Sequence, residues 1–293
     1  MTTISTLVPT DQRIHSPRGL VEHVRVALRL GGVLAWTGLS YGLFLVPALA
    51  TRRSPPVRRR VNAWAQRLWT RGLLRVLGVR RTRRGAPPVP PYFLVSNHLS
   101  YLDILVLGAE LGAVFVSKHD LAGWPLLGHL SRVTGTIFID RGRRRDALRV
   151  LTEIDGAIAA GAGVLLFPEG TSSRGDGILP LRAALLEWAA RSGHPVHVAT
   201  VRYATEEGDR PASETVCWWG TATPILPHFL GLAALPRIHA EIVYGEAPVS
   251  GTSRTDLATA LHTELTRLFA PIGAEAHGSA SSPRDFPQSE EDR

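Results

Sequence analysis

The sequence is 293 residues long, with 44% hydrophobic residues and a formal net charge of +8. This length suffices for an α/β domain with an ample core, and the single cysteine, Cys217, excludes an intrachain disulfide and fits a reducing compartment. The basic balance indicates a polyanionic partner, such as an anionic lipid headgroup or an acidic carrier protein. Nucleic acid is disfavoured, because the sequence has no zinc-ligand spacing, basic-aromatic strand motif or heptad-bearing basic region.

Residues 1–84 are predicted to form a helical region attached to a membrane. Leu30 to Thr51 carries no charge and matches the length of about 20 residues that crosses a bilayer. Its glycines and Pro47 weaken a helix, so the run either spans the membrane or enters one leaflet as a hairpin. From Val57 to Arg84 apolar residues interleave with arginines, the composition of a helix in the headgroup plane or of a core helix with a solvated basic face. The positive flank after the run places its C-terminal side in the cytoplasm, so we expect a single-pass or monotopic protein at the cytoplasmic face of the cell membrane.

After a proline-rich linker over residues 85–91, the pattern predicts an α/β domain over residues 92–273. Apolar, β-prone runs alternate with helical patterns, which favours a central sheet flanked by helices. The expected strands are Tyr92–Ser96, Val114–Ser117, Thr136–Asp140, Gly163–Phe167, Val196–Arg202 and Ile238–Tyr244. The expected helices are Tyr101–Leu111, Arg144–Ala160, Leu181–Ser192 and Thr255–Phe269. Residues 274–293 are polar and acidic, as in a disordered tail.

The first candidate catalytic segment is Ser96-Asn97-His98-Leu99-Ser100-Tyr101-Leu102-Asp103. His98 is expected in the turn at the carboxyl end of a strand, the ligand-facing edge of such sheets, with Asp103 about one helical turn later. A carboxylate in that position fixes the imidazole tautomer and stabilises the imidazolium, as a general base requires. Ser100-x-x-Asp103 is also a capping-box pattern, so on these residues alone a structural turn is an equal alternative.

Two further segments suit a polar, anionic ligand. Leu165-Leu166-Phe167-Pro168-Glu169-Gly170-Thr171-Ser172-Ser173-Arg174 takes an apolar strand into a polar turn, in which glycine permits close approach to the backbone and the carboxylate can accept bonds from polyol hydroxyls. A turn followed by a helix cap is the alternative. Phe138-Ile139-Asp140-Arg141 precedes further arginines, whose guanidinium groups suit phosphate, although a basic helix start has the same composition.

These blocks resemble the glycerolipid acyltransferase family typified by 1-acyl-sn-glycerol-3-phosphate acyltransferase. That family shows Asn-His-x4-Asp, then Phe-Ile-x-Arg, then Phe-Pro-Glu-Gly-Thr, then an apolar strand that opens with proline. The same blocks stand here in that order, as Asn97-His98 with Asp103, Phe138–Arg141, Phe167–Thr171 and Pro195-Val196-His197-Val198. Lys118, Pro125 and Gly128 also match, and the resemblance extends from about Tyr92 to Tyr203.

The resemblance implies a role for each matching residue. His98 corresponds to the catalytic base and Asp103 to its orienting carboxylate, whereas Arg141, Glu169, Gly170 and Thr171 correspond to acceptor-binding positions. It also implies an α/β acyltransferase domain with an N-terminal helical membrane anchor, a lysolipid acceptor, and no metal or prosthetic group. The co-substrate is expected to be the thioester of coenzyme A or of acyl carrier protein.

Two departures concern the acceptor headgroup. Ser172 stands where phosphate-acceptor members carry arginine, and Leu181-Arg182-Ala183-Ala184 replaces Phe-Lys-x-Gly. The string ending in Ser172-Ser173 and the later Trp218-Trp219-Gly220 are more similar to the ornithine-lipid-type branch. Arg174 is a candidate for the missing cation. Lysophosphatidic acid is therefore the first expected acceptor, and lyso-ornithine lipid or another lyso-aminolipid is the alternative.

The expected reaction is direct transfer in a ternary complex, with His98 as base and Lys118, the only lysine, as a candidate donor to the oxyanion. A serine hydrolase would need Gly38-Leu39-Ser40-Tyr41-Gly42 as its nucleophile elbow, but this string lies within the apolar run. A metal hydrolase built from His98, Asp103, His119 and Asp120 lacks the helical His-Glu-x-x-His spacing. A non-catalytic lipid-binding protein is the rival from a different class.

Overall fold

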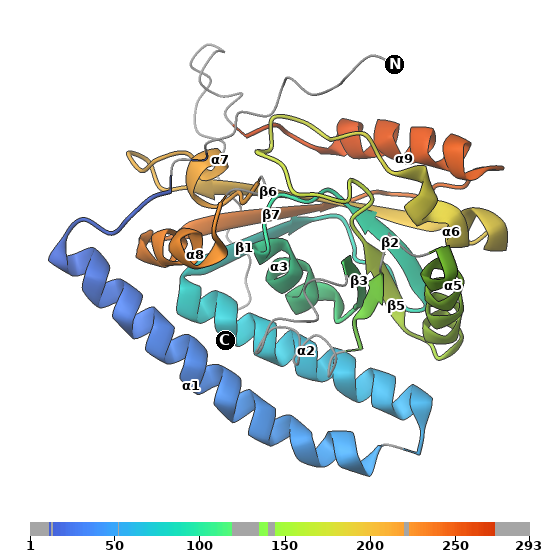
Figure 1. Cartoon of the computed structure of the whole chain (residues 1–293), viewed down its shortest axis with the longest axis horizontal. Coiled ribbons are helices and arrows are strands. Elements are labelled where there is room, and N and C mark those ends of the chain that lie inside the picture. Colours follow the sequence, from blue (N-terminus) through green and yellow to red (C-terminus); the bar gives the residue numbers. More distant parts are fainter. Residues whose placement is uncertain are drawn as a thin grey trace.

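The computed structural model describes residues 12, 14–51, 53–118, 135–139, 144–219 and 223–272. In this part of the chain a central sheet of seven strands has the order β1-β7-β6-β2-β5-β3-β4 (Figure 1). The strands are β1 (Val79–Arg84), β2 (Tyr92–Ser96), β3 (Val114–Lys118), β4 (Ile137–Ile139), β5 (Gly163–Leu166), β6 (Val196–Thr205) and β7 (Ile238–Tyr244). All neighbours are parallel except β6 and β7, which are antiparallel.

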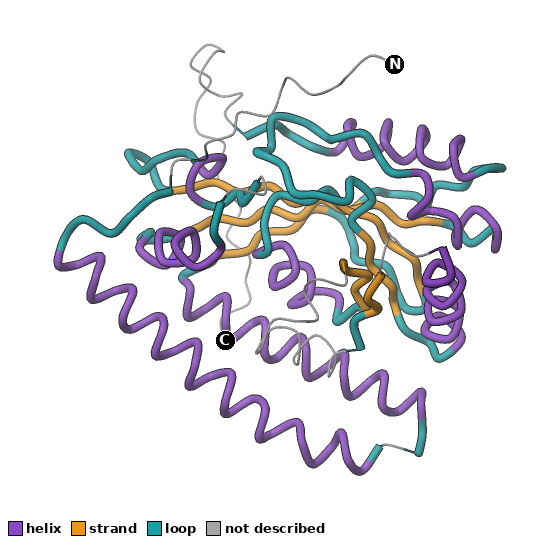
Figure 2. The backbone as a smooth tube through the Cα atoms, viewed as in Figure 1, coloured by secondary structure: helices purple, strands orange, loops and turns teal. Residues whose placement is uncertain are grey.

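Helices cover both faces of this sheet, as Figure 2 shows in purple and orange. The helices are α1 (Leu20–Ala50), α2 (Pro55–Leu77), α3 (Leu102–Leu111), α5 (Arg144–Ala159), α6 (Glu187–Ser192, preceded by a 3-10 turn over Ala183–Leu186), α7 (Ala212–Thr215), α8 (Ile225–Ala234) and α9 (Arg254–Leu268). Side chains from α2, α3 and α8 form one hydrophobic core with the sheet. Side chains from α5, α6 and α9 form a second core on the opposite face.

The central strand β2 explains why two cores form. Its five residues, Tyr92–Ser96, are all buried, as expected for a parallel strand covered on both faces. Alternate side chains go to opposite faces, so Leu94 joins the core beside α3 and Phe93 joins the core beside α6. Strands β2, β5, β3 and β6 run parallel to one another, so their carboxyl ends lie at one edge of the sheet. Loops at that edge carry the predicted site.

The N-terminal helices α1 and α2 form a hairpin against the domain (Figure 1). Trp36 Nε1 on α1 donates to the Trp69 carbonyl on α2 over 2.9 Å, and Trp69 Nε1 donates to Thr37 Oγ1 over 3.2 Å. The helices are so close at Gly72 that a Cβ there would lie 2.0 Å from the Trp36 ring. The apolar helix α1 therefore has a fixed partner, the arginine-rich α2.

Arginines of this hairpin cap the C-terminal ends of two other helices. Arg25 and Arg29 donate to the carbonyls of Ala233, Ala234, Leu235 and Pro236 at the end of α8. Arg67 and Arg71 donate to the carbonyls of Ala109, Glu110 and Leu111 at the end of α3. The last carbonyls of a helix lack partners within the helix, and cations there also suit the helix dipole. These arginines dock the hairpin on the domain.

Most of the sequence-based elements are confirmed. The six expected strands are β2 to β7, and the four expected helical segments are α3, α5, the turn with α6, and α9. The helix expected from Val57 to Arg84 is wrong after Leu77, because Gly78, at φ 74°, ends it with a left-handed cap. Residues 79–84 instead form the edge strand β1. The apolar run Leu30–Thr51 lies in a helix that begins earlier, at Leu20, and α8 was not predicted. The expected tail lies outside the described residues.

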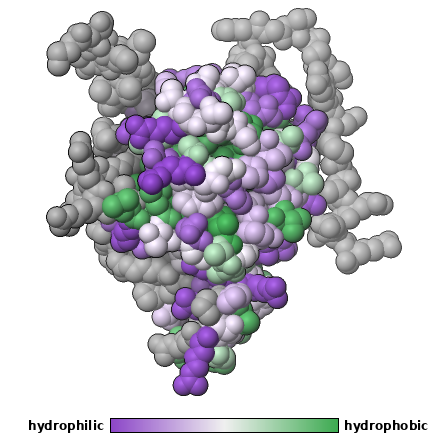
Figure 3. Space-filling view, turned by 90° about the vertical axis from the view of Figure 1, so that its right-hand side faces the viewer, coloured by the Kyte–Doolittle hydropathy of each residue, from purple (hydrophilic) through white to green (hydrophobic). Residues whose placement is uncertain are grey.

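The apolar helix α1 is largely exposed. Its segment Leu20–Pro47 is long and apolar enough to cross a membrane by length and composition, and only 11% of its most apolar window is buried. Exposed side chains along it are Leu20, Val21, Val24, Leu28, Leu34, Leu39, Tyr41, Leu43, Leu45, Val46 and Leu49. By contrast, the side of the molecule that carries α5 and α6 shows a mostly hydrophilic surface with scattered hydrophobic residues (Figure 3).

Candidate active site

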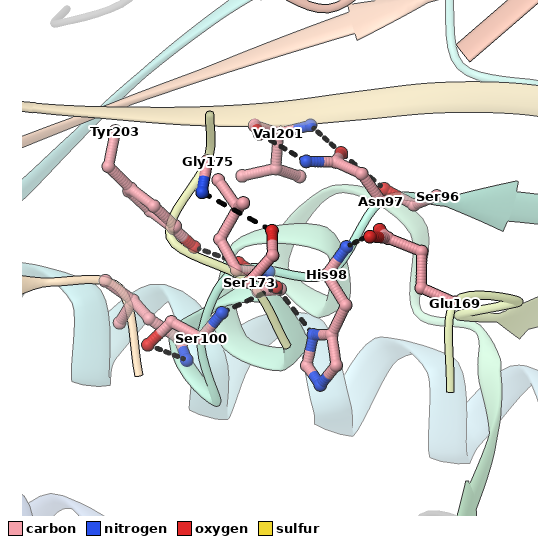
Figure 4. Close-up of polar contacts among 12 residues, drawn as sticks. Ser96, Asn97, His98, Ser100, Glu169, Ser173, Gly175, Val201 and Tyr203 are labelled. Atoms are coloured by element: carbon pink, nitrogen blue, oxygen red, sulfur yellow. Dashed lines mark hydrogen bonds and ion pairs between the residues drawn. The ribbon is translucent and has the colours of Figure 1, made fainter. Parts of the chain in front are cut away.

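The candidate site begins where β2 ends. Ser96 is the last residue of β2 in register with Ala199 of β6. The Asn97 side chain then continues the pairing, because its Nδ2 donates to the Val201 carbonyl over 3.0 Å and its Oδ1 accepts from the Val201 amide over 2.7 Å. An amide side chain matches a peptide group in both donor and acceptor. Asn97 thereby fixes the start of the loop that carries His98 (Figure 4).

Asp103, in the first turn of α3, accepts several hydrogen bonds from this loop. Its Oδ2 lies 2.7 Å from His98 Nδ1 and accepts from the amides of Leu99, over 2.7 Å, and Ser100, over 3.0 Å. Its Oδ1 accepts from the Tyr203 hydroxyl over 2.6 Å. The side chain is 0% exposed. A buried carboxylate with four donors is satisfied as an anion.

This arrangement fixes the tautomer of His98. Because Asp103 Oδ2 accepts from Nδ1, the proton of the neutral imidazole lies on Nδ1 and Nε2 carries the free lone pair. Within the described part of the chain no hydrogen bond to Nε2 is found, and the His98 side chain is 21% exposed. The ring stacks on Phe167, with centroids 4.2 Å apart and an interplanar angle of 17°. His98 is thus oriented in the way that a general base requires, with Nε2 available.

Glu169 holds the same loop from the other side. Its Oε1 accepts from the His98 amide over 2.8 Å, and its Oε2 accepts from the Leu179 amide over 2.9 Å. Burial raises the pKa of this carboxyl to about 7, against the two backbone donors that lower it. The Ser173 amide donates a hydrogen bond to the His98 carbonyl over 2.9 Å. The loops after β2 and β5 are therefore joined at His98 by two hydrogen bonds.

Comparison with known proteins identifies the family of this chain. The model of the acyltransferase family matches residues 79–204, a range that contains all of these contacts. A lyso-ornithine lipid O-acyltransferase of Brucella abortus is 32% identical over 71% of this chain and 83% of its own length. The chain belongs to the acyltransferase family. It is therefore an acyltransferase, and the predicted enzyme class is confirmed.

Two other relatives of this acyltransferase show how far the similarity extends. A lyso-ornithine lipid O-acyltransferase of Rhodobacter capsulatus is 32% identical over 83% of this chain and 90% of its own length. A 1-acyl-sn-glycerol-3-phosphate acyltransferase of Neisseria meningitidis is 37% identical over 48% of this chain and 56% of its own length. The crystal structure of the 1-acyl-sn-glycerophosphate acyltransferase of Thermotoga maritima matches with a TM-score of 0.61 at 17% identity, over 89% of this chain and 98% of that one. This match confirms the predicted fold.

The other predicted site residues lie near this edge or outside the described residues. Gly170, at φ 72°, is in the turn that closes with its amide on the Phe167 carbonyl over 3.2 Å, and Thr171 follows it in an exposed position. The Arg174 guanidinium lies 5.4 Å from the centroid of the Trp219 ring. Lys118 ends β3, but its side chain is outside the described set, as is all of Arg141. The structure thus brings together His98, Asp103 and the segment 167–174.

The structure also bears on the rival enzyme classes. Ser40 is 1% exposed in the middle of α1, not between a strand and a helix as a nucleophile elbow requires. Among the residues that the structure describes, no group of three or more His, Cys, Asp or Glu side chains is arranged to hold a metal ion. His119 and Asp120, considered for a metal site, lie outside the described residues.

Sequence reasoning did not predict the contacts that other elements make with the loop of His98 and with its neighbours. Tyr203 on β6 contacts Asp103, and the Trp218 amide donates to the Leu99 carbonyl over 2.8 Å. The Tyr101 hydroxyl lies 3.1 Å from Nδ1 of His228, a buried histidine whose pKa burial lowers to about 4. The alternation of apolar residues along Val196–Thr205 was the available signal for Tyr203, since it places this tyrosine on the α3 face.

Proposed function

We propose that this acyltransferase moves a fatty acyl group from a thioester to the free hydroxyl of a lysolipid, and that lysophosphatidic acid is the first acceptor to test. Such a reaction belongs to membrane phospholipid synthesis. The observation that carries the proposal is the 2.7 Å contact between His98 Nδ1 and a fully buried Asp103 carboxylate, which leaves Nε2 to act on a hydroxyl.

The reaction follows from this geometry in two proton transfers. His98 Nε2 takes the proton of the lysolipid hydroxyl while the oxygen attacks the thioester carbonyl carbon. The Asp103 carboxylate stabilises the resulting imidazolium through Nδ1. When the tetrahedral intermediate collapses, the carbon–sulfur bond breaks, and His98 returns the proton to the leaving thiolate. The products are the diacyl lipid and the free thiol, and His98 is neutral again.

The oxyanion of that intermediate needs a donor, and Lys118 stays our candidate. It is the only lysine of the chain, and its backbone lies at the carboxyl end of β3, beside Ile139 of β4. This is the edge of the sheet that carries His98. Lys118→Ala should lower the turnover number strongly if it is the donor, and unchanged turnover would remove it from the mechanism.

We assign the acceptor headgroup to the segment after β5 and to the arginines before α5. Thr171 and Gly170 offer a hydroxyl and an accessible backbone, whereas Arg141 and Arg174 offer guanidinium groups that match phosphate or carboxylate oxygens. Support for Arg174 is its stacking on Trp219, which holds the guanidinium in a fixed orientation. Glu169 contributes through the loop rather than through a free carboxylate, because both of its oxygens already accept backbone bonds.

A second acceptor, lyso-ornithine lipid, is favoured by a specific observation. The relatives that carry this name align with 66% to 90% of their own lengths, whereas the meningococcal 1-acyl-sn-glycerol-3-phosphate acyltransferase aligns with 56%. Ser172 in place of an arginine agrees with this acceptor. The reaction and the base are the same for both acceptors, and only the headgroup contacts differ.

The acyl donor is proposed to be the thioester of coenzyme A or of acyl carrier protein, with no metal or prosthetic group. Both donors are anionic and both suit a chain of net charge +8. Purified coenzyme A and carrier-protein thioesters, supplied separately at equal concentration, distinguish them by the rate of thiol release.

We further propose that the enzyme lies in one leaflet at the cytoplasmic face rather than crossing the membrane. Since α1 packs along α2, a spanning α1 would carry α2 into the hydrocarbon layer. The arginines of α2 that remain exposed are Arg58, Arg60, Arg71 and Arg75, and each costs about 2.5–3.5 kcal/mol at the bilayer centre. An interfacial position instead buries the apolar side chains of α1 and leaves the arginines at the headgroups.

The decisive test supplies both acceptors to the same preparation. Purified enzyme in vesicles receives an acyl thioester with lysophosphatidic acid or with lyso-ornithine lipid, and the acylated product is measured by mass spectrometry. Product from lysophosphatidic acid supports the first acceptor, and product from lyso-ornithine lipid alone supports the second. Binding of either lipid without thiol release would contradict the proposal and favour a non-catalytic lipid-binding protein.

A further inference from the structure

A buried tyrosine lies behind the proposed catalytic pair. Tyr203 is 1% exposed, and its hydroxyl donates to Asp103 Oδ1 over 2.6 Å, on the oxygen that His98 does not contact. We propose that Tyr203 is a positioning residue that limits the basicity of the Asp103 carboxylate and thereby sets the pH at which His98 can act as a base. This inference rests on the proposed acyl transfer, and its test includes a measurement that needs no activity.

The sheet places Tyr203 in this position. Ala199, Val201 and Tyr203 alternate along β6 and belong to the core beside α3. The two hydrogen bonds between the Asn97 side chain and the Val201 backbone fix β6 against the loop of His98, two residues before Tyr203. On its other side Tyr203 is in register with Ala240 of β7. Figure 4 shows its side chain directed from β6 toward the loop of His98. The backbone of Tyr203 is therefore held by β7 on one side, and the bonds of Asn97 to Val201 fix β6 on the other side two residues earlier.

The two carboxylate oxygens of Asp103 have different hydrogen-bond partners. Oδ2 orients the imidazole and two backbone amides, whereas Oδ1 faces the phenol. A short hydrogen bond from an O–H group draws negative charge toward Oδ1. Charge drawn to Oδ1 is not available at Oδ2, so the carboxylate attracts the proton of His98 less strongly. Burial and the neighbouring Asp103 raise the pKa of Tyr203 well above its ordinary value, so the phenol stays a donor throughout the working range.

Other ionisable groups face this cluster from each element around it. They are His98 and Tyr101 on the catalytic loop, Glu169 and Arg174 after β5, Asp176 beyond them, Cys217 after α7 and His228 on α8. Cys217 is buried and burial raises its pKa, and His228 is neutral because burial lowers its pKa to about 4. Neither group titrates near neutral pH. Glu169, whose pKa burial raises to about 7, does titrate there, so the comparison must be made between variants that all keep Glu169.

The inference predicts the direction of a shift. Removing the phenol hydroxyl in Tyr203→Phe leaves Asp103 Oδ1 without its donor, so more negative charge faces His98 Nδ1. The protonated imidazole becomes more stable, and the acid limb of the pH–rate profile moves to higher pH. The expected movement is about one pH unit, since a hydrogen bond to a charged group is stronger than one between neutral groups and only part of its effect reaches His98. The Michaelis constant should change little, because Tyr203 is too deeply buried to touch a substrate.

The chain offers a matched control in Tyr92. This tyrosine lies on β2, the strand that leads to His98, and its hydroxyl is buried with no hydrogen-bond partner in the described structure. Tyr92→Phe removes the same atom from the same core without touching Asp103. A general loosening of the core would affect both variants, whereas a specific action on Asp103 affects only Tyr203→Phe.

The experiment follows the protonation of His98 directly. The full chain in detergent micelles is labelled with ¹⁵N-histidine, the His98 signal is assigned from His98→Asn, and its imidazole nitrogens are titrated by NMR in wild type, Tyr203→Phe and Tyr92→Phe. We expect proton uptake by His98 at higher pH in Tyr203→Phe, by about one unit, and no change in Tyr92→Phe. The pH–rate profile of thioester consumption should shift by the same amount. If no acyl transfer is detected in any sample, the proposed function fails, but the titration still decides the role of Tyr203.

An equal titration midpoint in wild type and Tyr203→Phe overturns the inference, as does an equal shift in Tyr92→Phe. If Tyr203→Phe does not fold, 3-fluorotyrosine placed at position 203 replaces it, because this side chain keeps the size and the hydroxyl but is a stronger donor. The midpoint must then move to lower pH, opposite to the direction for phenylalanine. A midpoint that stays or rises would refute the role of the phenol.

Discussion

The replacement of Asp103 by asparagine separates the charge of the carboxylate from its shape. Asp103 accepts from His98 Nδ1 and from two backbone amides at Oδ2, and from the Tyr203 hydroxyl at Oδ1. In Asp103→Asn the amide oxygen can take the Oδ2 position and keep those three donors. The amide nitrogen then faces the Tyr203 oxygen, which can accept. The hydroxyl proton of Tyr203 then has no acceptor, which lowers the free energy of unfolding by about 1–3 kcal/mol.

Asp103→Asn should lower the turnover number much more than it lowers the free energy of unfolding. A neutral amide cannot stabilise the imidazolium that forms at His98, so most of the general-base contribution, about 10²–10⁴ in turnover number, is expected to be lost. Asp103→Ala is a poorer test, because it leaves four donors without a partner, three of them fully buried, at about 1–3 kcal/mol each. That total is comparable with the whole free energy of unfolding of a domain, about 5–15 kcal/mol.

The assay is thiol release from an acyl thioester with saturating lysolipid, beside thermal unfolding of the same samples. We expect Asp103→Asn to unfold within a few degrees of wild type and to turn over at least about a hundredfold more slowly. A well-folded Asp103→Asn enzyme with more than half of the wild-type turnover would show that the His98–Asp103 contact is structural, and the proposed mechanism would have to be abandoned.

Three further outcomes are expected. The pKa of Glu169 is about 7 in the folded protein against an ordinary value of 4.5, so the folded state binds this proton more tightly than the unfolded state does. The resulting stabilisation, on the order of 3 kcal/mol, is full below about pH 4.5 and is lost as the pH rises through about 7. Glu169→Gln should therefore unfold in urea with a flatter dependence on pH than wild type, and an unchanged slope would refute the assignment. Gly72→Ala should lower the unfolding temperature and loosen the α1–α2 hairpin, because its Cβ would lie 2.0 Å from the Trp36 ring. Gly38→Ala, whose Cβ would have nothing within 4 Å, should leave the unfolding temperature and the hairpin unchanged or more stable. Equal rates of limited proteolysis for the two variants would contradict the packing of α1 on α2. Asn97→Ala leaves the Val201 amide and carbonyl unpaired and should reduce the free energy of unfolding in urea by about 2–6 kcal/mol. A loss below about 1 kcal/mol would show that the two bonds between Asn97 and Val201 do not stabilise the fold.

The strands and the loop of His98 could be predicted because their signals are local. Apolar β-prone runs gave β2 to β7, and the spacing of His98 and Asp103 gave the pair that lies 2.7 Å apart. Glu169 lies beside His98 in the structure, but its interpretation as an acceptor for polyol hydroxyls did not anticipate that both oxygens bind backbone amides. A carboxylate that follows a strand looks the same in sequence whether its partner is a ligand or a neighbouring loop.

The remaining features depend on contacts between distant parts of the chain. Tyr203 meets Asp103 across 100 positions of sequence, and no local pattern encodes that contact. Arg25 and Arg29 lie just before the apolar run Leu30–Thr51, but they cap α8, which lies more than 200 positions away. The strand β1 was missed because Gly78 stops a helix whose arginine-rich pattern continues past it. In each case tertiary packing decides a role that composition leaves open.

The role of His98 as the base is the central claim, and one comparison tests it most directly. Wild type and His98→Ala are purified in parallel, shown to unfold at similar temperatures, and supplied with an acyl thioester and lysophosphatidic acid or lyso-ornithine lipid. The account predicts acylation of at least one acceptor by the wild type and a fall of about 10²–10⁴ or more in the variant. Acylation by a folded His98→Ala enzyme at a rate near that of wild type would contradict it.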